Sequence, residues 1–410
     1  MSKSLEIPLK TPFTRYEIFV IAILSILQFT IILDFMVLSP LGAQLLIELN
    51  IKPAQFGLVV SAYAFSAGAS GLLAAGFADK FDRKKLLLFF YTGFILGTIF
   101  CASAPSYEFL LFARIFTGIF GGVIGSICMA VITDLFSMEV RGRVMGFVQT
   151  AFAASQVLGI PIGLVLANKY SWHAPFWMIV IFSIIVYALI VIYLRPISEH
   201  LKLQSQSNAV QHLWNTIRTP QYLRAFLAVI VLSTGGFMLM PFGSAFSTNN
   251  MKIAMADLPW IYGTTGVFSI ILGPLIGKYS DKIGKYNLFV IGSIVSMIMI
   301  GIFTHLGVTP LWLAMVINVI IFTGISARMI SSSALLTAVP KPQDRGAFMS
   351  IIASFQQLSG GVAAALAGLI VVQTTSGVLS NYDILGYVVI TSMLIAIGMM
   401  YLLNKQIQNK

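Results

Sequence analysis

Long runs of apolar residues dominate the chain, and short polar segments separate them. A helix needs about 20 apolar residues to cross the hydrocarbon core of a bilayer. The runs show no alternation of polar and apolar positions, which favours helices over the strands of a β-barrel. The pattern predicts twelve membrane-spanning helices, at 18–40, 54–78, 86–104, 108–134, 143–167, 174–194, 222–247, 258–277, 287–306, 311–338, 347–373 and 383–403.

The composition supports lipid as the main solvent of this protein. Of the 410 residues, 58% are hydrophobic and only 10% are charged, whereas a soluble domain carries about 25% charged residues. The polar side chains are too few to cover a surface that faces water. We therefore expect an all-α integral membrane protein.

A net charge of +11 could indicate a nucleic-acid partner, but the distribution of the basic residues argues against one. With the N-terminus inside, 20 of the 25 Lys and Arg residues fall in segments on the cytoplasmic side. Only Lys52, Lys169 and Lys252 fall on the opposite side, while Arg114 and Arg328 lie within spans. By the positive-inside rule, this asymmetry predicts a multi-pass protein with both termini in the cytoplasm.

The chain aligns with itself at an offset of about half its length. The matching segments are Pro40–Ala43 with Pro241–Ser244, Ala78–Lys84 with Ser280–Tyr286, Ile115–Ile119 with Ile321–Ile325, and Arg141–Gly142 with Arg345–Gly346. Each half holds an even number of spans, so the two copies share one orientation in the membrane. We expect six-helix bundles at 1–194 and 222–410, related by pseudo-twofold symmetry. The segment 195–221 is expected to be a cytoplasmic linker with a short surface helix near 209–218.

The loop after the second span of each half carries a family resemblance. The segment 277–285 fits the pattern Gly-x-x-x-Asp-Arg/Lys-x-Gly-Arg/Lys at every defined position, and 75–83 departs from it only at Ala75 and Asp82. With these motifs the sequence resembles the major facilitator superfamily over essentially its whole length. Within it, the chain looks most like the twelve-helix drug:proton antiporters and the sugar-efflux permeases. The resemblance implies the major facilitator fold and a substrate site between the halves, near the midplane.

Two further motifs refine the resemblance. Arg114 with Gly118 resembles the buried-arginine motif that the family links to proton coupling. Gly159, Pro161 and Gly163 resemble a shortened form of the antiporter glycine-proline motif. They imply that protons are the coupling ion, with no other cofactor, and the second motif favours export.

The resemblance also implies a latch of charged residues at the cytoplasmic ends of the helices. Asp79 would face the N-terminal end of the eleventh helix, where partial positive charge favours a carboxylate, and Asp134 would pair with Arg83. The latch residues expected from both repeats are Asp79, Arg83, Asp134, Asp281, Lys285, Arg141 and Arg345. Alternatively, these charges serve only topology and loop folding. The equivalent places of Asp79 and Asp281 in the two repeats favour the latch.

Asp34 is the one acidic residue well inside a span. An ionisable residue at depth costs about 2.5–3.5 kcal/mol on insertion scales and so indicates function. Asp34 lies six residues before Pro40, and Arg114 lies six residues after Glu108. At ~1.5 Å per residue, both lie roughly 9 Å below the outer surface. We expect Asp34 to carry the proton and Arg114 to regulate it; the alternative is a static buried pair that fixes helix packing.

Arg328 lies in the middle third of its span and has no acidic counterpart in the C-terminal half. We expect it to contact an anionic or polar group of the substrate, the alternative being a bond to backbone carbonyls or to Asn318. Other polar residues at depth either line the substrate path or form interhelical hydrogen bonds. The full set of expected substrate-binding residues is Arg328, Gln28, Tyr63, Gln149, Asn318 and Gln356.

Several function classes fit a duplicated membrane protein. A proton-coupled exporter (antiporter) of a small organic molecule or drug is favoured by Asp34, Arg114 and the glycine-proline motif. The alternative is a proton-coupled uptake symporter for a polar or anionic metabolite. An enzyme is not expected, because the sequence lacks His-Glu-x-x-His, a Ser/His pair at depth and a metal-ligand cluster. We expect a monomer in a bacterial inner membrane that works by alternating access and binds no nucleic acid.

Overall fold

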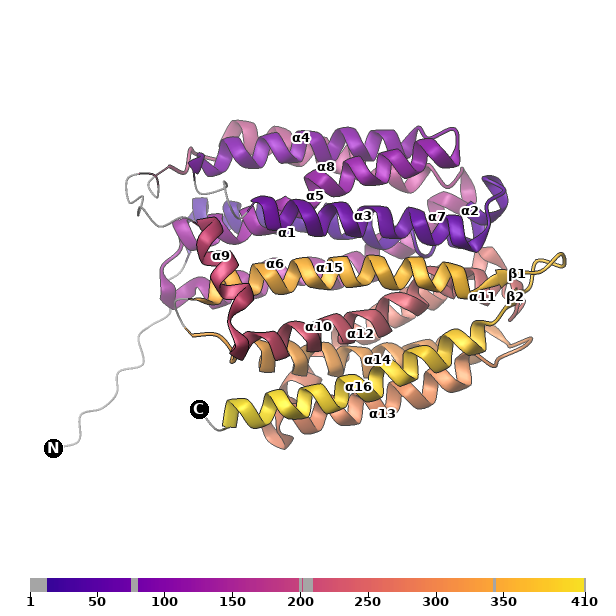
Figure 1. Ribbon diagram of the computed structural model, residues 1–410. Helices are drawn as coiled ribbons and strands as arrows, with labels where there is room; N and C mark the ends of the chain where they lie inside the picture. The colour runs from indigo at the N-terminus through magenta and orange to yellow at the C-terminus, as the bar shows by residue number, and fades with distance from the viewer. Residues whose placement is uncertain (1–12, 75–79, 199–200, 202–208, 342–343, 409–410) are drawn as a thin grey trace.

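The computed structural model describes residues 13–74, 80–198, 201, 209–341 and 344–408, and its helices run side by side as an elongated bundle (Figure 1). Twelve helical segments in these residues are long and apolar enough to cross a membrane, which confirms the predicted number. The N-terminal half contains α1 (Arg15–Val37), α2 (Gly42–Glu48), α3 (Pro53–Ala74), α4 (Arg83–Ala102), α5 (Tyr107–Leu135), α6 (Met138–Ala154), the π-helical turn η2 (Ser155–Gly159), α7 (Ile160–Lys169) and α8 (Ala174–Tyr193).

The C-terminal half repeats this order after a short helix in the linker. That helix, expected near 209–218, is confirmed as α9 (Ala209–Arg218). The elements that follow are α10 (Pro220–Leu239), η4 (Met240–Phe242), α11 (Gly243–Asn249), η5 (Met255–Asp257), α12 (Leu258–Ile283), α13 (Lys285–Phe303), α14 (Leu311–Thr337), α15 (Arg345–Ile370), β1 (Val372–Gln373), β2 (Leu379–Ser380) and α16 (Tyr382–Gln408).

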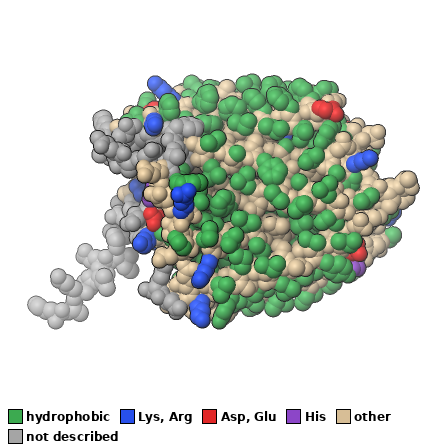
Figure 2. Space-filling view, viewed as in Figure 1, with side chains coloured by type: hydrophobic (Ala, Val, Ile, Leu, Met, Phe, Trp, Pro, Cys, Tyr) green, Lys and Arg blue, Asp and Glu red, His purple; other side chains and the backbone are tan. Residues whose placement is uncertain are grey.

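The two ends of the bundle carry different features. We call the end that holds α9, the start of α1 and the end of α16 the linker end (Figure 1). The opposite end, which holds α2, α11 and the antiparallel pair β1–β2, is the hairpin end. On the face seen in Figure 2, Lys and Arg side chains gather at the linker end and hydrophobic side chains cover the middle. This is the distribution expected of a protein whose middle lies in lipid.

Many large apolar side chains on the outside of the bundle are exposed. Phe89, Ile192, Trp260 and Leu369 are 63%, 67%, 64% and 71% exposed. In water, a contiguous apolar surface of this kind would drive association. Lipid tails are as apolar as these side chains, so the surface suits a bilayer.

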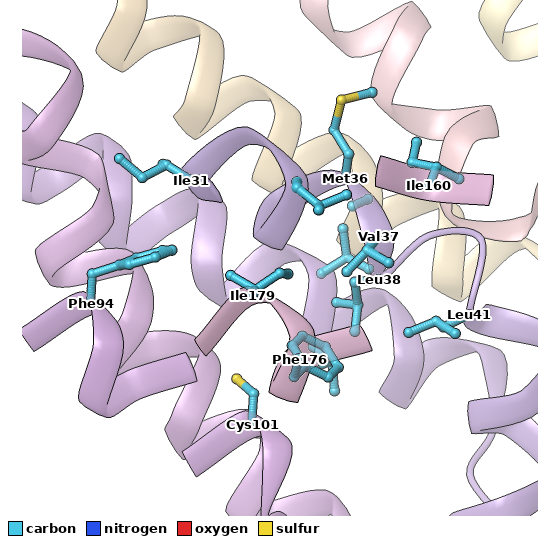
Figure 3. Packing of buried hydrophobic residues seen from close by; sticks show 14 of the residues in the cluster. Ile31, Met36, Val37, Leu38, Leu41, Phe94, Cys101, Ile160, Phe176 and Ile179 are labelled. Atoms are coloured by element: carbon cyan, nitrogen blue, oxygen red, sulfur yellow. The ribbon is translucent and has the colours of Figure 1, made fainter. Parts of the chain in front are cut away.

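The interior of the N-terminal half is tightly packed where α1 ends. Figure 3 shows Val37 and Leu38 beside Ile160 of α7 and beside Phe176 and Ile179 of α8. Each of these five side chains is at most 3% exposed. Since lipid offers an equally apolar environment, this packing stabilises the bundle through close dispersion contacts rather than through exclusion of water.

The two halves meet along a seam between α3 and α15, where small residues let the backbones approach closely. A Cβ added to Gly57 would lie 2.7 Å from the Ala364 carbonyl oxygen and 3.2 Å from the Cα of Gly368. A Cβ added to Gly68 would lie 2.8 Å from Cγ of Leu358. Glycine and alanine at helix contacts are typical of membrane bundles, because dispersion between backbones replaces the hydrophobic effect.

Hydrogen bonds join the two halves to each other at the hairpin end. Ser244 Oγ at the start of α11 donates to the carbonyl of Ser39 at 3.0 Å. Asn168 Nδ2 of α7 donates to the carbonyl of Met255 in η5 at 2.9 Å. Each of these bonds joins an N-terminal element to a C-terminal one, so this end of the bundle is shut.

The contact between the fifth and eighth spans covers only part of their length. A Cβ added to Gly266 of α12 would lie 2.7 Å from the Cα of Val157 in η2. Nearer the linker end, a Cβ added to Gly273 or Gly277 of α12, or to Gly146 of α6, would meet open space. The helices α6 and α12 therefore part toward the linker end.

The two copies of the loop motif turn differently. Gly284, between α12 and α13, has φ 91° and ψ 140°, a conformation essentially restricted to glycine. At the equivalent place, Asp82 has φ −56°, and its Oδ1 accepts a hydrogen bond from the Lys85 N–H at 3.0 Å. A side-chain cap on α4 thus replaces the glycine turn, which explains the departure from the motif at Asp82. Ala75 lies outside the described residues.

The linker helix α9 lies against the C-terminal half. Leu213 and Ile217 pack on the buried cluster that α10 and α15 share. Close by, the Tyr222 hydroxyl donates to Asp344 Oδ2 at 2.6 Å, and His212 Nε2 lies 3.8 Å from Asp344 Oδ1. These contacts attach α9 to the starts of α10 and α15.

Candidate functional site

The structure brings Asp34 of α1 and Arg114 of α5 into contact. Arg114 Nη1 lies 2.8 Å from Asp34 Oδ2, and both residues are 0% exposed. Nη1 also lies 3.4 Å from the backbone carbonyl oxygen of Asp34, to which it donates. Asp34 and Arg114, for which the sequence predicted the same depth in the membrane, therefore form a direct, fully buried ion pair.

The partners of the ion pair are unevenly distributed over its atoms. Among the described residues, Asp34 Oδ1 has the Thr98 hydroxyl of α4 as its hydrogen-bond donor, at 3.5 Å, and that hydroxyl shares its one hydrogen with the nearer Phe94 carbonyl at 2.9 Å. Arg114 Nε has no hydrogen-bond partner among the described residues. Sequence reasoning missed Thr98, because a threonine in an apolar span usually bonds to its own helix and gives no separate signal.

Aromatic rings connect the ion pair to the other half. The Arg114 guanidinium lies 4.5 Å from the centroid of the Tyr63 ring. The Tyr63 ring lies 5.4 Å from Phe35 of α1, which lies 5.8 Å from Phe237 of α10. Tyr63, expected to line the substrate path, is 1% exposed in this conformation and contacts the ion pair. The three rings form a continuous contact from Arg114 to the C-terminal half.

Gly118, four residues after Arg114, makes room for this arrangement. A Cβ at Gly118 would lie 2.6 Å from the carbonyl oxygen of Tyr63 and 2.0 Å from Ser66 Oγ. A Cβ at Gly121 would lie 2.7 Å from the Tyr63 hydroxyl. The glycines bring α3 against α5, so that the Tyr63 ring reaches the guanidinium.

The glycine-proline motif of the fifth span packs against α1 at residues on both sides of Asp34. Pro161 has no N–H to donate to the carbonyl four residues earlier, and the π-helical turn η2 occurs just before it. A Cβ at Gly159 would lie 2.5 Å from Leu33 Cδ1, and one at Gly163 would lie 3.1 Å from Val37 Cγ2. The two glycines therefore let α1 pack closely against the fifth span on both sides of Asp34.

Comparison with known proteins identifies the kind of protein that contains this site. The family model described as Major Facilitator Superfamily matches residues 24–364 and, in an overlapping match, residues 226–410. The chain belongs to the major facilitator superfamily. Its resemblance to that family, carried by the loop motifs, is thereby confirmed.

The chain is similar to two transporters of Bacillus subtilis (strain 168) and to one solved bacterial structure. It is 29% identical to the uncharacterized MFS-type transporter YceJ over 269 residues, an alignment that covers 65% of the chain and 67% of that relative. It is 24% identical over 306 residues to multidrug resistance protein 2 of the same organism, covering 71% and 76%. A bacterial homolog of the human lysosomal transporter Spinster, solved inward-facing and unoccupied, matches with TM-score 0.77 at 14% identity over 97% and 99% of the two chains. That likeness shows the major facilitator fold.

Two of the charged residues expected in the latch, Arg83 and Arg141, make contacts within the N-terminal half. Arg83 Nε lies 2.9 Å from Asp134 Oδ2. Arg141 Nε donates to the Phe136 carbonyl at 2.9 Å, and its Nη2 donates to the Thr133 carbonyl at 2.6 Å. Arg141 therefore binds carbonyl groups at the C-terminal end of α5, where a cation is favoured.

The other residues expected in the latch are exposed or lie outside the described part of the chain. Lys285 and Arg345 are exposed at the first positions of α13 and α15. Asp79 lies outside the described residues, as does the side chain of Asp281. The latch between the halves stays a prediction.

Arg328 of α14 is 4% exposed, and the described residues do not supply its expected partners. Its Nε and Nη2 have no hydrogen-bond partner among them. Neither nitrogen therefore bonds to Asn318, whose amide nitrogen donates to the Ala314 carbonyl of its own helix at 3.4 Å. The nearest aromatic contact is Phe289 of α13, whose ring centroid lies 5.7 Å from Arg328 Cζ.

The remaining polar candidates lie at different depths. Gln28 of α1 is half-buried, and its Nε2 would lie 3.7 Å from a Cβ at Gly125 of α5. Gln356 of α15 and Asn318 are half-buried, while Gln149 of α6 is exposed where α6 and α12 part. Their role in binding substrate stays a prediction.

Proposed function

We propose that this superfamily member is a proton-coupled exporter that exchanges protons for a small organic molecule by alternating access. The observation that carries the proposal is the fully buried pair of Asp34 and Arg114. A carboxylate at this depth is costly to keep charged, and it can bind and release a proton only as its surroundings change.

The pair offers a definite place for the proton. Arg114 holds Asp34 Oδ2 at 2.8 Å, whereas Oδ1 has only the Thr98 hydroxyl at 3.5 Å. A proton on Oδ1 would neutralise the carboxylate and leave Arg114 without a counter-charge. Because an unbalanced buried charge is strongly destabilising, Arg114 and the Tyr63 ring against it would rearrange. The ring contacts through Phe35 and Phe237 would then pass the change to the other half.

The separation of α6 and α12 supports alternating access. The hairpin end is shut by bonds between the halves, while these two helices part toward the linker end. The asymmetry of basic residues supports placing the linker end and both termini in the cytoplasm of a bacterial inner membrane.

Export is supported by the likeness to a protein named for multidrug resistance and by the glycine-proline motif beside Asp34. Uptake by symport is the second candidate, because the unpaired Arg328 suits an anionic metabolite. The two differ in the relative direction of proton and cargo.

The test is substrate-induced proton movement in proteoliposomes that contain a pH-sensitive dye and carry an imposed pH gradient. A panel of drugs and metabolites is added one at a time. We expect at least one compound to move protons opposite to its own flux, and Asp34→Asn to abolish this movement. The control is Asp383→Asn, at the hairpin end of α16, which is expected to retain it. Movement in the same direction would establish symport, and full coupling by Asp34→Asn would exclude Asp34 as the carrier.

A further inference from the structure

We propose that Arg328 binds the anionic group, a carboxylate or a phosphate, of the molecule that this protein transports. The inference rests on the proposed transport function and adds the chemical class of the cargo. It starts from the buried arginine in α14, whose Nε and Nη2 have no hydrogen-bond partner in the part of the chain that the structure describes.

The two unpartnered nitrogens of Arg328 form one binding edge. Nε–H and the outer N–H of Nη2 project in parallel from the same side of the planar guanidinium. This edge matches the two oxygens of a carboxylate or phosphate and gives paired, charge-assisted hydrogen bonds. Both Nε and Nη2 are buried and lack acceptors among the described residues, so an anion that reached this edge when the helices move would find both donors unused.

The chain supplies no acid at this depth to balance the charge. Its C-terminal half contains only four acidic residues, Asp257, Asp281, Asp344 and Asp383. The first and last belong to η5 and the start of α16 at the hairpin end, while the other two lie near the linker end of α12 and just before α15. A neutral acceptor would accept the hydrogen bonds but leave the positive charge unbalanced. An anion would accept the hydrogen bonds and also balance the charge.

The surroundings of Arg328 add hydroxyl groups with unused hydrogen-bonding capacity. Ser331, one turn further along the same face of α14, is 0% exposed, and its Oγ has no partner among the described residues. Ser296 of α13, against which a Cβ at Gly324 would come within 2.5 Å of Oγ, is likewise buried and unpartnered. Buried polar atoms are nearly always bonded, so several unpartnered polar atoms within about one helical turn of Arg328 favour a role in binding a polar group.

The close approach of α13 and α14 fixes the guanidinium in place. A Cβ at Gly292 would lie 2.8 Å from the Ala327 Cβ and 3.2 Å from the Arg328 backbone nitrogen. With the backbone held and the Phe289 ring 5.7 Å from Cζ, the side chain has few alternatives. A preformed site of this kind loses little conformational entropy when it binds.

The experiment is thermal unfolding of the purified protein in a neutral detergent, with benzoate, its neutral analogue benzamide, or inorganic phosphate at constant ionic strength. A ligand that binds only the folded protein raises the unfolding temperature in a concentration-dependent way. We expect benzoate or phosphate to stabilise the wild type and benzamide not to. In Arg328→Met, the half-saturating concentration of the anion should rise by about tenfold to a hundredfold or more, because one hydrogen bond to a charged group accounts for that range and Arg328 offers two. Arg328→Lys keeps the charge without the two-donor edge, so its half-saturating concentration should lie between those of the wild type and of Arg328→Met.

The matched control is Arg224→Met, which removes an exposed arginine from α10 of the same half and should leave the response unchanged. Without added anion, Arg328→Met should unfold at a temperature equal to or higher than that of the wild type, because an unbalanced buried charge is gone. A marked fall in that temperature would show a structural role and overturn the proposal. An anion response that Arg328→Met keeps, or the absence of any anion response in the wild type, would overturn it too.

A lipid headgroup could supply the same chemistry, so one arm adds phosphatidylglycerol to the detergent. Stabilisation by this lipid alone, without any by soluble anions, would assign Arg328 to lipid and overturn the cargo proposal. None of these measurements involves a proton gradient or a direction of transport. Failure of the anion site can therefore be told apart from failure of proton exchange.

Discussion

Arg114 in the N-terminal half and Arg328 in the C-terminal half are both buried, and the surroundings of the two differ. Arg114 in the N-terminal half has Asp34 at 2.8 Å and an aromatic ring at 4.5 Å. Arg328 in the C-terminal half has an aromatic ring at 5.7 Å and two nitrogens without partners among the described residues. A buried charge that is matched inside the protein serves the protein itself, whereas an unmatched one is available to a ligand. If the two proposals above hold, the duplicated fold divides proton binding and cargo binding between its copies.

The largest expected effect comes from breaking the matched pair. Arg114→Met should lower the free energy of unfolding by about 3–5 kcal/mol, because it leaves Asp34 buried without a counter-charge. The measurement is denaturant unfolding in detergent. The double variant Asp34→Leu with Arg114→Met should recover most of the loss, since a buried pair can be replaced by apolar residues at little cost. A double variant that is no more stable than the single one would contradict the pairing.

The next effect converts the unmatched arginine into a matched one. Ser331 and Ser183 are both 0% exposed serines within spans, but only Ser331 lies one turn from an arginine. Ser331→Asp should therefore be tolerated, while Ser183→Asp should cost about 2.5–3.5 kcal/mol of stability. Ser331→Asp should also abolish stabilisation by benzoate, because the new carboxylate occupies the guanidinium. Equal losses of stability in both variants would show that Arg328 is not available for pairing.

A smaller effect concerns the rings that cover the two guanidinium groups. A double-mutant cycle of Arg114→Met with Tyr63→Leu should give a coupling free energy of about 2 kcal/mol, the value for a desolvated cation–π contact. The corresponding cycle of Arg328→Met with Phe289→Leu should give less, because its ring is 1.2 Å more distant (5.7 against 4.5 Å). Both are measured by thermal unfolding. A larger coupling free energy between Arg328 and Phe289 than between Arg114 and Tyr63 would contradict the expectation that Arg114 has the stronger cation–π contact.

The smallest effect extends the comparison to the two loop motifs. Gly284→Ala should cost about 1 kcal/mol or more, because φ 91° with ψ 140° is strained for any residue with a Cβ. Asp82→Gly should cost only a few tenths of a kcal/mol, since glycine is nearly as good as aspartate at a helix N-cap. Unfolding temperatures of the two variants test this order. Equal costs would mean that the loops do not differ in the way their backbones indicate.

Much of the fold could be predicted from the sequence because lipid imposes simple requirements. The number of spans follows from apolar length, and the short helix at 209–218 follows from the change to a polar linker. Asp34 and Arg114 could be matched because both are rare charges in apolar spans whose depths are set by a fixed helical rise. Signals of this kind depend on single residues and on counting along one helix.

Features that depend on contacts between helices could not be predicted in the same way. The sequence does not show that Tyr63 turns onto Arg114 rather than toward the substrate path. Nor does it show that Arg328 Nε and Nη2 lie without a hydrogen-bond partner among the described residues. Thr98 joins the ion pair only because α4 and α1 come together there. Each of these outcomes is decided by the rotation of one helix against another.

The seam between α3 and α15 has a mechanical consequence. Gly57, Ala364 and Gly368 present nearly bare backbone to one another near the hairpin end, whereas the Leu358 side chain packs on Gly68 further along the seam. Near the hairpin end the two helices can therefore roll over a small angle without separating interlocked side chains. The same bare backbone provides little resistance to opening, which leaves the balance to bonds such as that from Asn168 to Met255 at the hairpin end. At about 1 kcal/mol for one such bond, losing it would change the ratio of open to closed molecules about fivefold.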